Sequence, residues 1–237
     1  MTAPTIEILF QDEHILAINK PSGVLSIPDG GQSQAEHVRN LLEPRFGRLW
    51  TVHRLDRETS GVLLLARDLA AHHALNDQFA SRNVKKEYRA IVSGTPDLDT
   101  WRIDLALLKN GDRSHRTIID LEDGKPASTT VTVLERYPGG YSLLSVRPHT
   151  GYTHQIRAHL AACGLPILGD PLYQAKPHAS MLDELQVAPV RRPVFADRLG
   201  LHAFTIQFTH PVSQVEMTLT APYPADFSAV LLEVKTG

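Results

Sequence analysis

Apolar residues in the first part of the chain come in short runs separated by polar breaks. The β-prone runs IEILF (6–10) and ILAIN (15–19) are separated by the polar QDEH, a pattern that predicts two strands joined by a turn. The tetrapeptide KPSG (20–23) then introduces proline and glycine, which interrupt regular structure. The chain is therefore expected to begin as a pair of strands.

A first helix is predicted soon afterwards. Ser33 and Glu36 have the spacing of a capping box, which places the start of the helix there. Pro44 is expected to stop it. The apolar face of this helix would consist of Val38, Leu41 and Leu42.

A buried strand and a second helix follow. GVLLLA (61–66) is a continuous apolar run between polar residues, as expected of a buried strand. A helix is predicted near 68–81, with Asp68 as its N-cap. YRAIVSG (88–94) has the composition of another strand. The apolar residues of the helix recur about one turn apart, at Ala71, Leu75 and Phe79.

The remaining chain is rich in strand-like stretches. LHAFTIQF (201–208) and VEMTLTA (215–221) read as paired strands on either side of the turn THPVS. Four further stretches with strand character are WRIDLALL (101–108), RTIIDL (116–121), STTVTVLER (128–136) and YSLLSV (141–146).

Two helices are predicted in the same half. One begins near Thr153, with Ile156 and Leu160 facing inward and Gly164 just past its end. The other is the amphipathic tail ADFSAVLLEVK. The segment 174–198, interrupted by prolines, is predicted to be a loop.

Strands outnumber helices and do not alternate with them regularly. This order predicts an α+β fold with a mixed, mostly antiparallel sheet and flanking helices, and it disfavours a Rossmann-type protein. The length of 237 residues fits one large domain or a pair of fused subdomains. The sequence has no internal repeat.

Composition narrows the class of protein. A net charge of −2 does not by itself indicate a nucleic-acid binder, which would need its basic residues gathered on one face. RNVKKEYR (82–89) gathers some, but on charge alone such a run is a solvated face. No apolar run approaches the ~18–20 residues that span a bilayer, and the start of the chain lacks signal-peptide features. The single cysteine, Cys163, cannot form an intramolecular disulfide, so a reducing cytoplasm is expected.

Several common sites have no support in the sequence. The glycine-rich dinucleotide and P-loop motifs are missing, as is the G-x-S-x-G elbow of α/β-hydrolases. One cysteine excludes zinc sites built on several thiolates. Among the histidines, His154 and His159 lie five residues apart, about 140° around a helix, and cannot share one face. No metal site is therefore expected.

The segment HRLDRETSG (53–61) is the most informative one. It places Asp56 between Arg54 and Arg57, on a loop that runs into the predicted buried strand. One interpretation is a structural ion pair that ties down the loop, and for an isolated R-x-D-R this is favoured. The other is a carboxylate kept ionised by its cationic neighbours and able to act as a nucleophile or base. The local pattern alone does not choose between them.

A resemblance that extends over most of the chain favours the reactive carboxylate over the structural ion pair. VHRLDRETSGVLLLA resembles the central motif of the RluA-type family of RNA pseudouridine synthases, and four further segments resemble other family motifs in the expected order. Together the five segments extend from residue 15 to residue 211. The four are ILAINKPSGV (15–24), KKEYRAIVSG (85–94), TGYTHQIRAHLAACGLPILGDPLY (150–173) and LHAFTIQFTHP (201–211).

The resemblance implies a pseudouridine synthase fold with a central active-site cleft, formed by a single catalytic domain over residues 1–237. It implies isomerisation of uridine to pseudouridine in RNA, with no cofactor and no metal. Asp56 corresponds to the catalytic carboxylate; whether it attacks the base, attacks the sugar or removes a sugar proton stays open. Arg157 corresponds to the arginine that pairs with this aspartate. Tyr88 corresponds to the tyrosine that stacks on the target base and takes part in proton removal from C5.

Further positions are carried over as RNA- or base-binding residues. Arg54 matches the residue that fills the gap left by the flipped nucleotide, and Arg57 flanks the aspartate on the other side. Lys20 and His53 are motif positions with supporting roles. Ile156, beside Arg157, is either an apolar wall of the pocket or a core residue.

Two departures from the family pattern concern RNA docking. Tyr152 stands where the family usually has the arginine of T-G-R-T-H-Q, so a phosphate contact is lost or replaced by stacking. Gln174 stands where a glycine is usual, a change expected to alter only a loop. Too little chain precedes the first motif for an S4-like domain, so specificity is expected from the catalytic domain itself, through RNA shape, phosphate contacts and a splayed loop.

The leading hypothesis is an active enzyme on a stem-loop of tRNA or rRNA, with a cytoplasmic monomer as the default expectation. The main alternative is an RNA-binding or ribosome-assembly protein of the same fold that has lost its chemistry. A third is a metal-independent hydrolase built on His53, Asp56 and Ser60, which lacks an accompanying oxyanion-hole motif.

Overall fold

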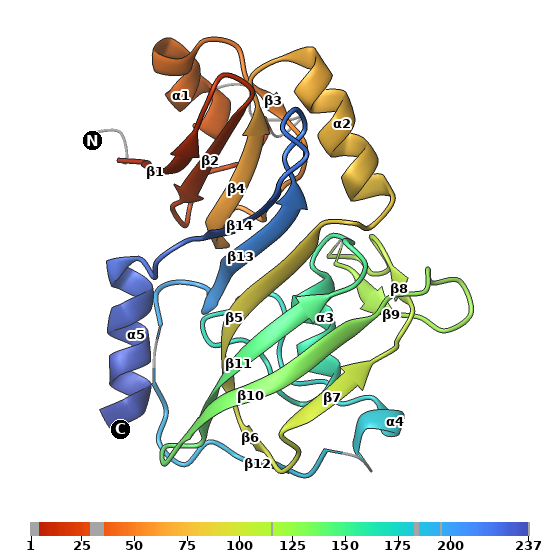
Figure 1. Cartoon of the computed structure of the whole chain (residues 1–237). Coiled ribbons are helices and arrows are strands. Elements are labelled where there is room, and N and C mark those ends of the chain that lie inside the picture. Colours follow the sequence, from red (N-terminus) through yellow and green to blue (C-terminus); the bar gives the residue numbers. More distant parts are fainter. Residues whose placement is uncertain (1–4, 29–35, 115, 183–184, 195, 237) are drawn as a thin grey trace. The chain divides into compact units, whose positions relative to one another are not determined.

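The computed structural model of the protein divides into two compact units (Figure 1). Unit 1 is formed by Met1–Lys86 and His202–Pro224, and unit 2 by Glu87–Leu201 and Ala225–Gly237. That these units act as one catalytic domain stays a prediction. The residues described by the structure are 5–28, 36–114, 116–182, 185–194 and 196–236.

Unit 1 is built around one fully buried strand, β4 (Ser60–Ala66). It pairs antiparallel with β2 (Ile15–Lys20) and parallel with the start of β13 (Leu201–Thr209). Burial of every residue of β4 explains its unbroken apolar run. Both hairpins predicted from the sequence are confirmed. The outer strands of unit 1 are β1 (Glu7–Gln11) paired with β2, β3 (Trp50–Thr51) paired with β4, and β14 (Glu216–Thr220) paired with β13.

Helix α2 (Leu69–Ala80) confirms the helix predicted after the buried strand. The side chain of Asp68 accepts a hydrogen bond from the Ala71 backbone N–H at 2.8 Å, as an N-cap does. Ala71 and Leu75 are buried. Local periodicity and capping therefore sufficed to place this helix.

Helix α1 (Val38–Phe46) differs from its prediction at both ends. Ser33, the predicted cap, lies outside the described residues, and the observed capping box joins His37 to Asn40. The prediction that Pro44 stops the helix is wrong. Pro44 lies in the last turn, where its missing N–H forgoes a single backbone hydrogen bond, and the helix ends at Gly47, whose φ of 72° leaves the helical region.

Gly61, at the start of β4, is required by close packing. Its φ is +115°, and an added Cβ would lie 2.2 Å from the carbonyl oxygen of Ala203 on β13. Gly61→Ala is expected to lower the free energy of unfolding by about 3 kcal/mol or more, because it combines backbone strain with a clash against a backbone. Gly23→Ala is the matched control, since Gly23 has a φ of +86° but open space around its Cβ position. Urea unfolding of both variants measures the difference, and equal losses would contradict the packing argument.

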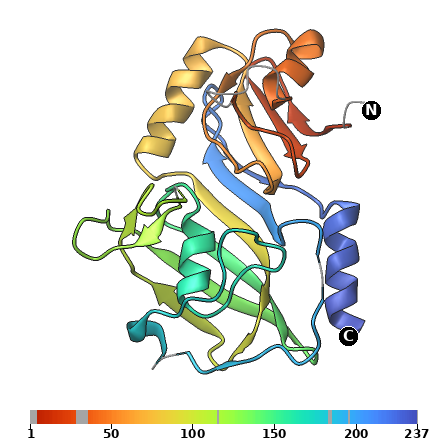
Figure 2. The ribbon, with the colours of Figure 1, turned by 180° about the vertical axis from the view of Figure 1, so that it is seen from behind.

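Unit 2 holds a four-stranded antiparallel sheet in the order β5-β11-β10-β7, with α3 (Gln155–Ala162) packed against it (Figure 2). Ile156 and Leu160 of α3 belong to the same buried cluster as Ala90, Val131 and Val146 of the sheet. The inward direction predicted for these two residues is thus confirmed. The remaining elements of unit 2 surround this core. The strands are β5 (Lys85–Ser93), β6 (Thr95–Pro96), β7 (Thr100–Ile103), β8 (Leu107–Leu108), β9 (Ile118–Ile119), β10 (Thr129–Tyr137), β11 (Tyr141–Pro148) and β12 (Val187–Ala188), and the other helices are α4 (Ala179–Leu182) and α5 (Ala225–Thr236).

Three sequence predictions in unit 2 are corrected in extent. The single strand predicted at 101–108 is two strands, because β7 pairs with β10 whereas β8 pairs with β9. The strand predicted at 116–121 is reduced to the two residues of β9. The predicted loop 174–198 contains α4 and β12, which pairs with β6. These short elements depend on partners that a local pattern does not reveal.

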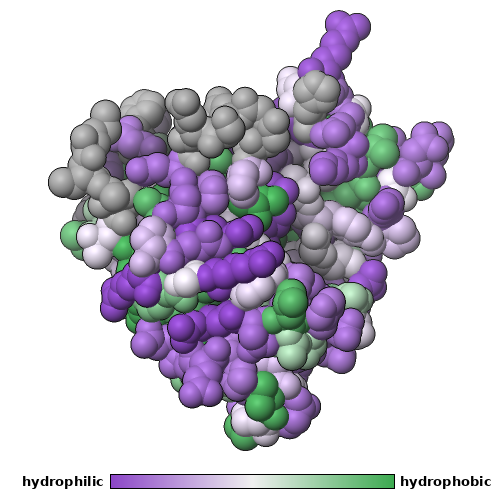
Figure 3. All heavy atoms as spheres, turned by 90° about the horizontal axis from the view of Figure 1, so that it is seen from above, coloured by the Kyte–Doolittle hydropathy of each residue, from purple (hydrophilic) through white to green (hydrophobic). Residues whose placement is uncertain are grey.

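The surface is mainly polar where it is seen from above (Figure 3). Hydrophilic residues predominate on that face, and hydrophobic ones are scattered in small groups. Within the described ranges, no helix is long and apolar enough to cross a membrane.

Candidate active site

Asp56 lies in the loop between β3 and β4 and is half-buried. Its carbonyl oxygen accepts a hydrogen bond from the Thr59 N–H at 3.1 Å, which forms a turn directly after the carboxylate. The preceding residue, Leu55, is buried and exchanges two hydrogen bonds with Ser26: its N–H donates to the hydroxyl at 3.0 Å, and its carbonyl accepts from that hydroxyl at 2.8 Å. The backbone on both sides of Asp56 is therefore fixed.

Lys20 ties the KPSG segment to the Asp56 loop. Its side chain is fully buried, and its ammonium group donates to the carbonyl oxygens of Pro21, Val24 and Arg57 at 2.9, 2.7 and 3.1 Å. The carbonyl of Arg57 also accepts from the N–H of Gly23 at 2.8 Å. A buried ammonium needs such acceptors to offset its lost hydration. Lys20 thus positions the residue next to Asp56.

The two arginines beside Asp56 are exposed. Arg57 donates from Nε to the carbonyl of Gly23 at 3.0 Å, so its stem follows the protein surface. Arg54 makes no hydrogen bond or ion pair with any other described residue. Both therefore present positive charge to solvent next to the half-buried carboxylate.

His53 holds the loop against β4 and α2. Its Nε2 accepts a hydrogen bond from the Leu64 N–H at 2.9 Å, and its ring stacks on Phe79 with the centroids 4.8 Å apart. Burial, aided by the charge of Lys86, lowers the pKa of His53 to about 3. His53 is therefore neutral near pH 7, with its proton on Nδ1, and serves to position the loop.

Replacement of His53 is expected to change the pH dependence of stability. Because the folded pKa of about 3 lies below the unfolded value of about 6.5, protonation favours the unfolded state. The neutral form of His53 costs the fold no stability above pH 6.5. As the pH falls from 6.5 toward 3, the free energy of unfolding decreases because the unfolded state takes up a proton on this histidine more readily. His53→Gln, whose side-chain carbonyl can still accept from Leu64, should show a shallower loss of unfolding free energy between pH 6.5 and 4. Urea titrations at several pH values measure it, and parallel pH profiles for the two proteins would contradict the assignment.

Arg157 lies on α3 in unit 2 and is 2% exposed. Its Nε and Nη2 each donate to a carboxylate oxygen of Asp170 at 2.7 Å, a bidentate pair in which the Asp170 side chain is wholly buried. The guanidinium also lies over the ring of Tyr173, 5.0 Å from its centroid. Asp170 was not among the predicted site residues, although it belongs to the GDPLY part of the resembling motif.

The other polar residues of α3 are also buried and bonded. The side-chain amide of Gln155 donates to the carbonyl of Ser128 and the hydroxyl of Thr129, both at 3.0 Å. His159 contacts the Thr129 hydroxyl through Nδ1 and the Leu105 carbonyl through Nε2, both at 2.9 Å, and burial lowers its pKa to about 4. These contacts fix the helix that carries Arg157.

The remaining predicted residues also lie in unit 2. Tyr88 is on β5 opposite Val146, half-buried and packed against the main core cluster. Ile156 is buried within that cluster, which accounts for it as a core residue. Tyr152 is half-buried, packs against a smaller cluster that includes Tyr173, and lines a pocket.

The structure thus groups the predicted residues in two sets. Unit 1 brings the Asp56 loop, with its arginines and His53, into contact with Lys20. Unit 2 carries Tyr88, Tyr152, Ile156 and Arg157. Within the part of the chain that the structure describes, no group of three or more side chains is arranged to hold a metal ion.

Comparisons with known proteins agree with the sequence motifs. A family model described as RNA pseudouridylate synthase matches residues 14–162. The dual-specificity RNA pseudouridine synthase RluA of Pasteurella multocida is 36% identical over 221 residues, 93% of this chain and 94% of that protein. RluA of Escherichia coli is 38% identical over 224 residues, 94% and 95% of the two chains.

Solved structures show the same fold. Human RNA pseudouridylate synthase domain containing 1 has a TM-score of 0.73 at 28% identity, with 95% of this chain and 87% of that chain covered. Human RNA pseudouridylate synthase domain containing 4 also has a TM-score of 0.73, at 27% identity, with 96% and 92% covered.

Proposed function

This chain belongs to the RluA-type RNA pseudouridine synthases and isomerises uridine to pseudouridine in RNA, and we propose that the carboxylate of Asp56 carries the chemistry. The reaction breaks the bond from C1' to N1, turns the base, and joins C1' to C5. The proton of C5 is removed and N1 gains one, so atoms balance and no electrons are exchanged.

The observation that supports Asp56 is its fixed position. The buried ammonium of Lys20 and the reciprocal bonds between Ser26 and Leu55 hold the backbone on both sides of this half-buried residue. A preorganised carboxylate loses little entropy when the uridine arrives. A structural ion pair would not require this three-point fixation of its loop.

The other residues would act on the flipped nucleotide. Arg54, exposed beside Asp56, would enter the gap that the uridine leaves in the RNA, and the cost of unstacking would be recovered by contacts in the pocket. Tyr88 would stack on the base and assist removal of the C5 proton. Arg157, already bound to Asp170, would pair with Asp56 through its remaining N–H groups.

The substrate would be a uridine in a stem-loop of tRNA or rRNA. The relatives from Pasteurella multocida and Escherichia coli are named dual-specificity enzymes, which favours more than one target for this chain as well. We place the enzyme in the cytoplasm, as a monomer that acts without a cofactor. The lone cysteine, Cys163, is buried and is not part of a disulfide, as suits a reducing compartment.

Pseudouridine mapping of tRNA and rRNA from wild-type and deletion strains tests this proposal. We expect one or more pseudouridines to disappear on deletion and to return when the gene is supplied again. Purified protein should then form pseudouridine at the same positions in unmodified transcripts without added metal or cofactor. An unchanged map in the deletion strain would favour the alternative of an RNA-binding protein without chemistry.

A further inference from the structure

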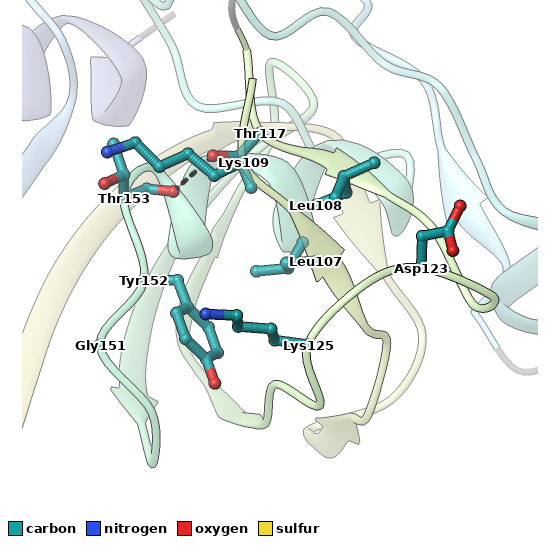
Figure 4. Close-up of a pocket in the computed structure, with 9 residues that line it drawn as sticks. All are labelled: Leu107, Leu108, Lys109, Thr117, Asp123, Lys125, Gly151, Tyr152 and Thr153. Atoms are coloured by element: carbon teal, nitrogen blue, oxygen red, sulfur yellow. Dashed lines mark hydrogen bonds between the residues drawn. The ribbon is translucent and has the colours of Figure 1, made fainter. Parts of the chain in front are cut away.

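A pocket in unit 2 lies apart from every position to which a catalytic role has been given. It has a volume of about 340 Å³ and is formed by the β8–β9 hairpin, the turn after it, and the segment before α3 (Figure 4). This volume is within the range of small-molecule sites, about 300–1,000 Å³. Its lining includes Leu107, Leu108, Lys109, Thr117, Lys125 and Tyr152.

We propose that this pocket binds one nucleotide of the substrate RNA that flanks the target uridine, with its base on Tyr152 and its phosphates on Lys109 and Lys125. The inference rests on the proposed function, since it supplies a docking site for the same RNA. It also explains how tyrosine can occupy the place of the family's usual arginine.

The charges in the pocket fit a phosphodiester. Lys109 and Lys125 are both exposed, and neither forms an ion pair with a described residue. In Figure 4 the amino end of Lys125 points toward Tyr152, and Asp123 lies on the other side of the pocket. The lining therefore carries two lysines and one carboxylate, and this excess of positive charge suits a phosphodiester.

The apolar lining fits a base. The Tyr152 ring packs against the cluster that contains Leu107, Ala158 and Tyr173, and it is also exposed to the pocket. The ring is thus held from the protein side, and Leu107 and Leu108 extend the apolar surface. Stacking of a base on such a ring is the usual way in which single-stranded RNA is held.

The pocket is preorganised. Leu107 and Lys125 exchange two backbone hydrogen bonds, each of 2.9 Å, which fixes the turn that carries Asp123 and Lys125. Gly124 permits this turn, because an added Cβ would lie 2.1 Å from the carbonyl oxygen of Asp120. The N–H of Tyr152 is bound by the side-chain oxygen of Gln155 at 3.1 Å. Both walls are therefore in place before RNA binds.

Tyr173 connects the pocket to Arg157, the proposed catalytic arginine. Thr117, in its lining, donates its N–H to the hydroxyl of Tyr173 at 2.9 Å. The ring of Tyr173 lies under the guanidinium of Arg157. A nucleotide in the pocket is thus separated from Arg157 by one layer of side chains, as a neighbour of the target uridine would be.

The test measures RNA binding and turnover of pocket variants on a transcript of the mapped stem-loop. Lys109→Ala combined with Lys125→Ala should weaken binding roughly 10-fold or more near 0.1 M salt and reduce the slope of log affinity against log salt by about 1.4, the loss of two single-strand phosphate contacts. Tyr152→Ala should weaken it by about 10-fold, and Tyr152→Phe should restore it. In each weakened variant KM should change more than kcat. Lys176→Ala, an exposed lysine outside the pocket, is the matched control.

The outcomes separate this inference from the proposed function. If Asp56→Asn abolishes pseudouridine formation but the double lysine variant keeps wild-type affinity and salt slope, the pocket proposal is overturned and the enzyme assignment stands. If Asp56→Asn leaves product formation intact, the proposed function fails instead. The lysines are exposed, so their variant carries the test even if Tyr152→Ala fails to fold.

Discussion

Asp56→Asn is expected to abolish pseudouridine formation, with a loss of about 10,000-fold or more in kcat, while folding and RNA binding stay close to wild type. The amide has the shape of the carboxylate but neither its charge nor its nucleophilicity, so each of the three routes open to Asp56 is blocked. Its side chain is half-buried, and Lys20 and Ser26 hold the loop through hydrogen bonds to backbone carbonyls on either side of Asp56. These contacts survive the substitution.

Single-turnover assays on a mapped transcript measure this effect, and RNA affinity and urea unfolding are measured on the same samples. Glu58→Gln is the matched control, since it removes one negative charge from the same loop two residues away. It should keep activity within a few-fold of wild type. Retention of activity within about 10-fold by Asp56→Asn would exclude it as the catalytic carboxylate.

Elements governed by local pattern were predictable from the sequence. The apolar run of β4, the cap and periodicity of α2, and the inward Ile156 and Leu160 of α3 each depend on neighbours along the chain, and each is observed. The hairpin of β13 and β14 was equally clear, because its two strands flank a short turn.

Elements governed by distant partners were not predictable. Residues 101–108 have a continuous strand composition, but β7 and β8 pair with different strands, and this separates them. A proline usually stops a helix, but Pro44 destabilises α1 only slightly because it lies in the last turn. In both cases a residue's neighbours in space decided the outcome.

The candidate site shows the same division. The resemblance supplied Asp56, Tyr88 and Arg157 as chemical groups, but it could not say what holds them. Lys20 bonds a carbonyl that is 37 residues away in sequence, and Arg157 pairs with an aspartate 13 residues away. Nothing in spacing or composition marks these contacts. They are nevertheless what would give the chemical groups a defined geometry.

Removal of the negative charge that Arg157 binds is expected to have the largest effect on stability. The Asp170 carboxylate accepts four hydrogen bonds, from Nε and Nη2 of Arg157 and from the N–H groups of Leu172 and Tyr173, at 2.7 to 3.0 Å. Asp170→Asn removes the carboxylate charge that Nε and Nη2 of the buried guanidinium bind, which should lower the free energy of unfolding by about 3–5 kcal/mol. The control is Asp104→Asn in the exposed pair with Arg102, where the change should be ~0–1 kcal/mol.

Stability and catalysis can be separated at this pair by removing both charges. Arg157→Met combined with Asp170→Leu replaces the ion pair with apolar side chains, and such replacements often recover the stability that a single substitution loses. If Arg157 acts on Asp56 or on the RNA, the double variant should be more stable than Asp170→Asn yet form pseudouridine at least about 100-fold more slowly than wild type. Unfolding free energy and single-turnover rate are compared at one temperature, below the melting point of every variant. A stable double variant with wild-type activity would make Arg157 a structural residue alone, because the fold would then need only a filled space at that position, not a charge.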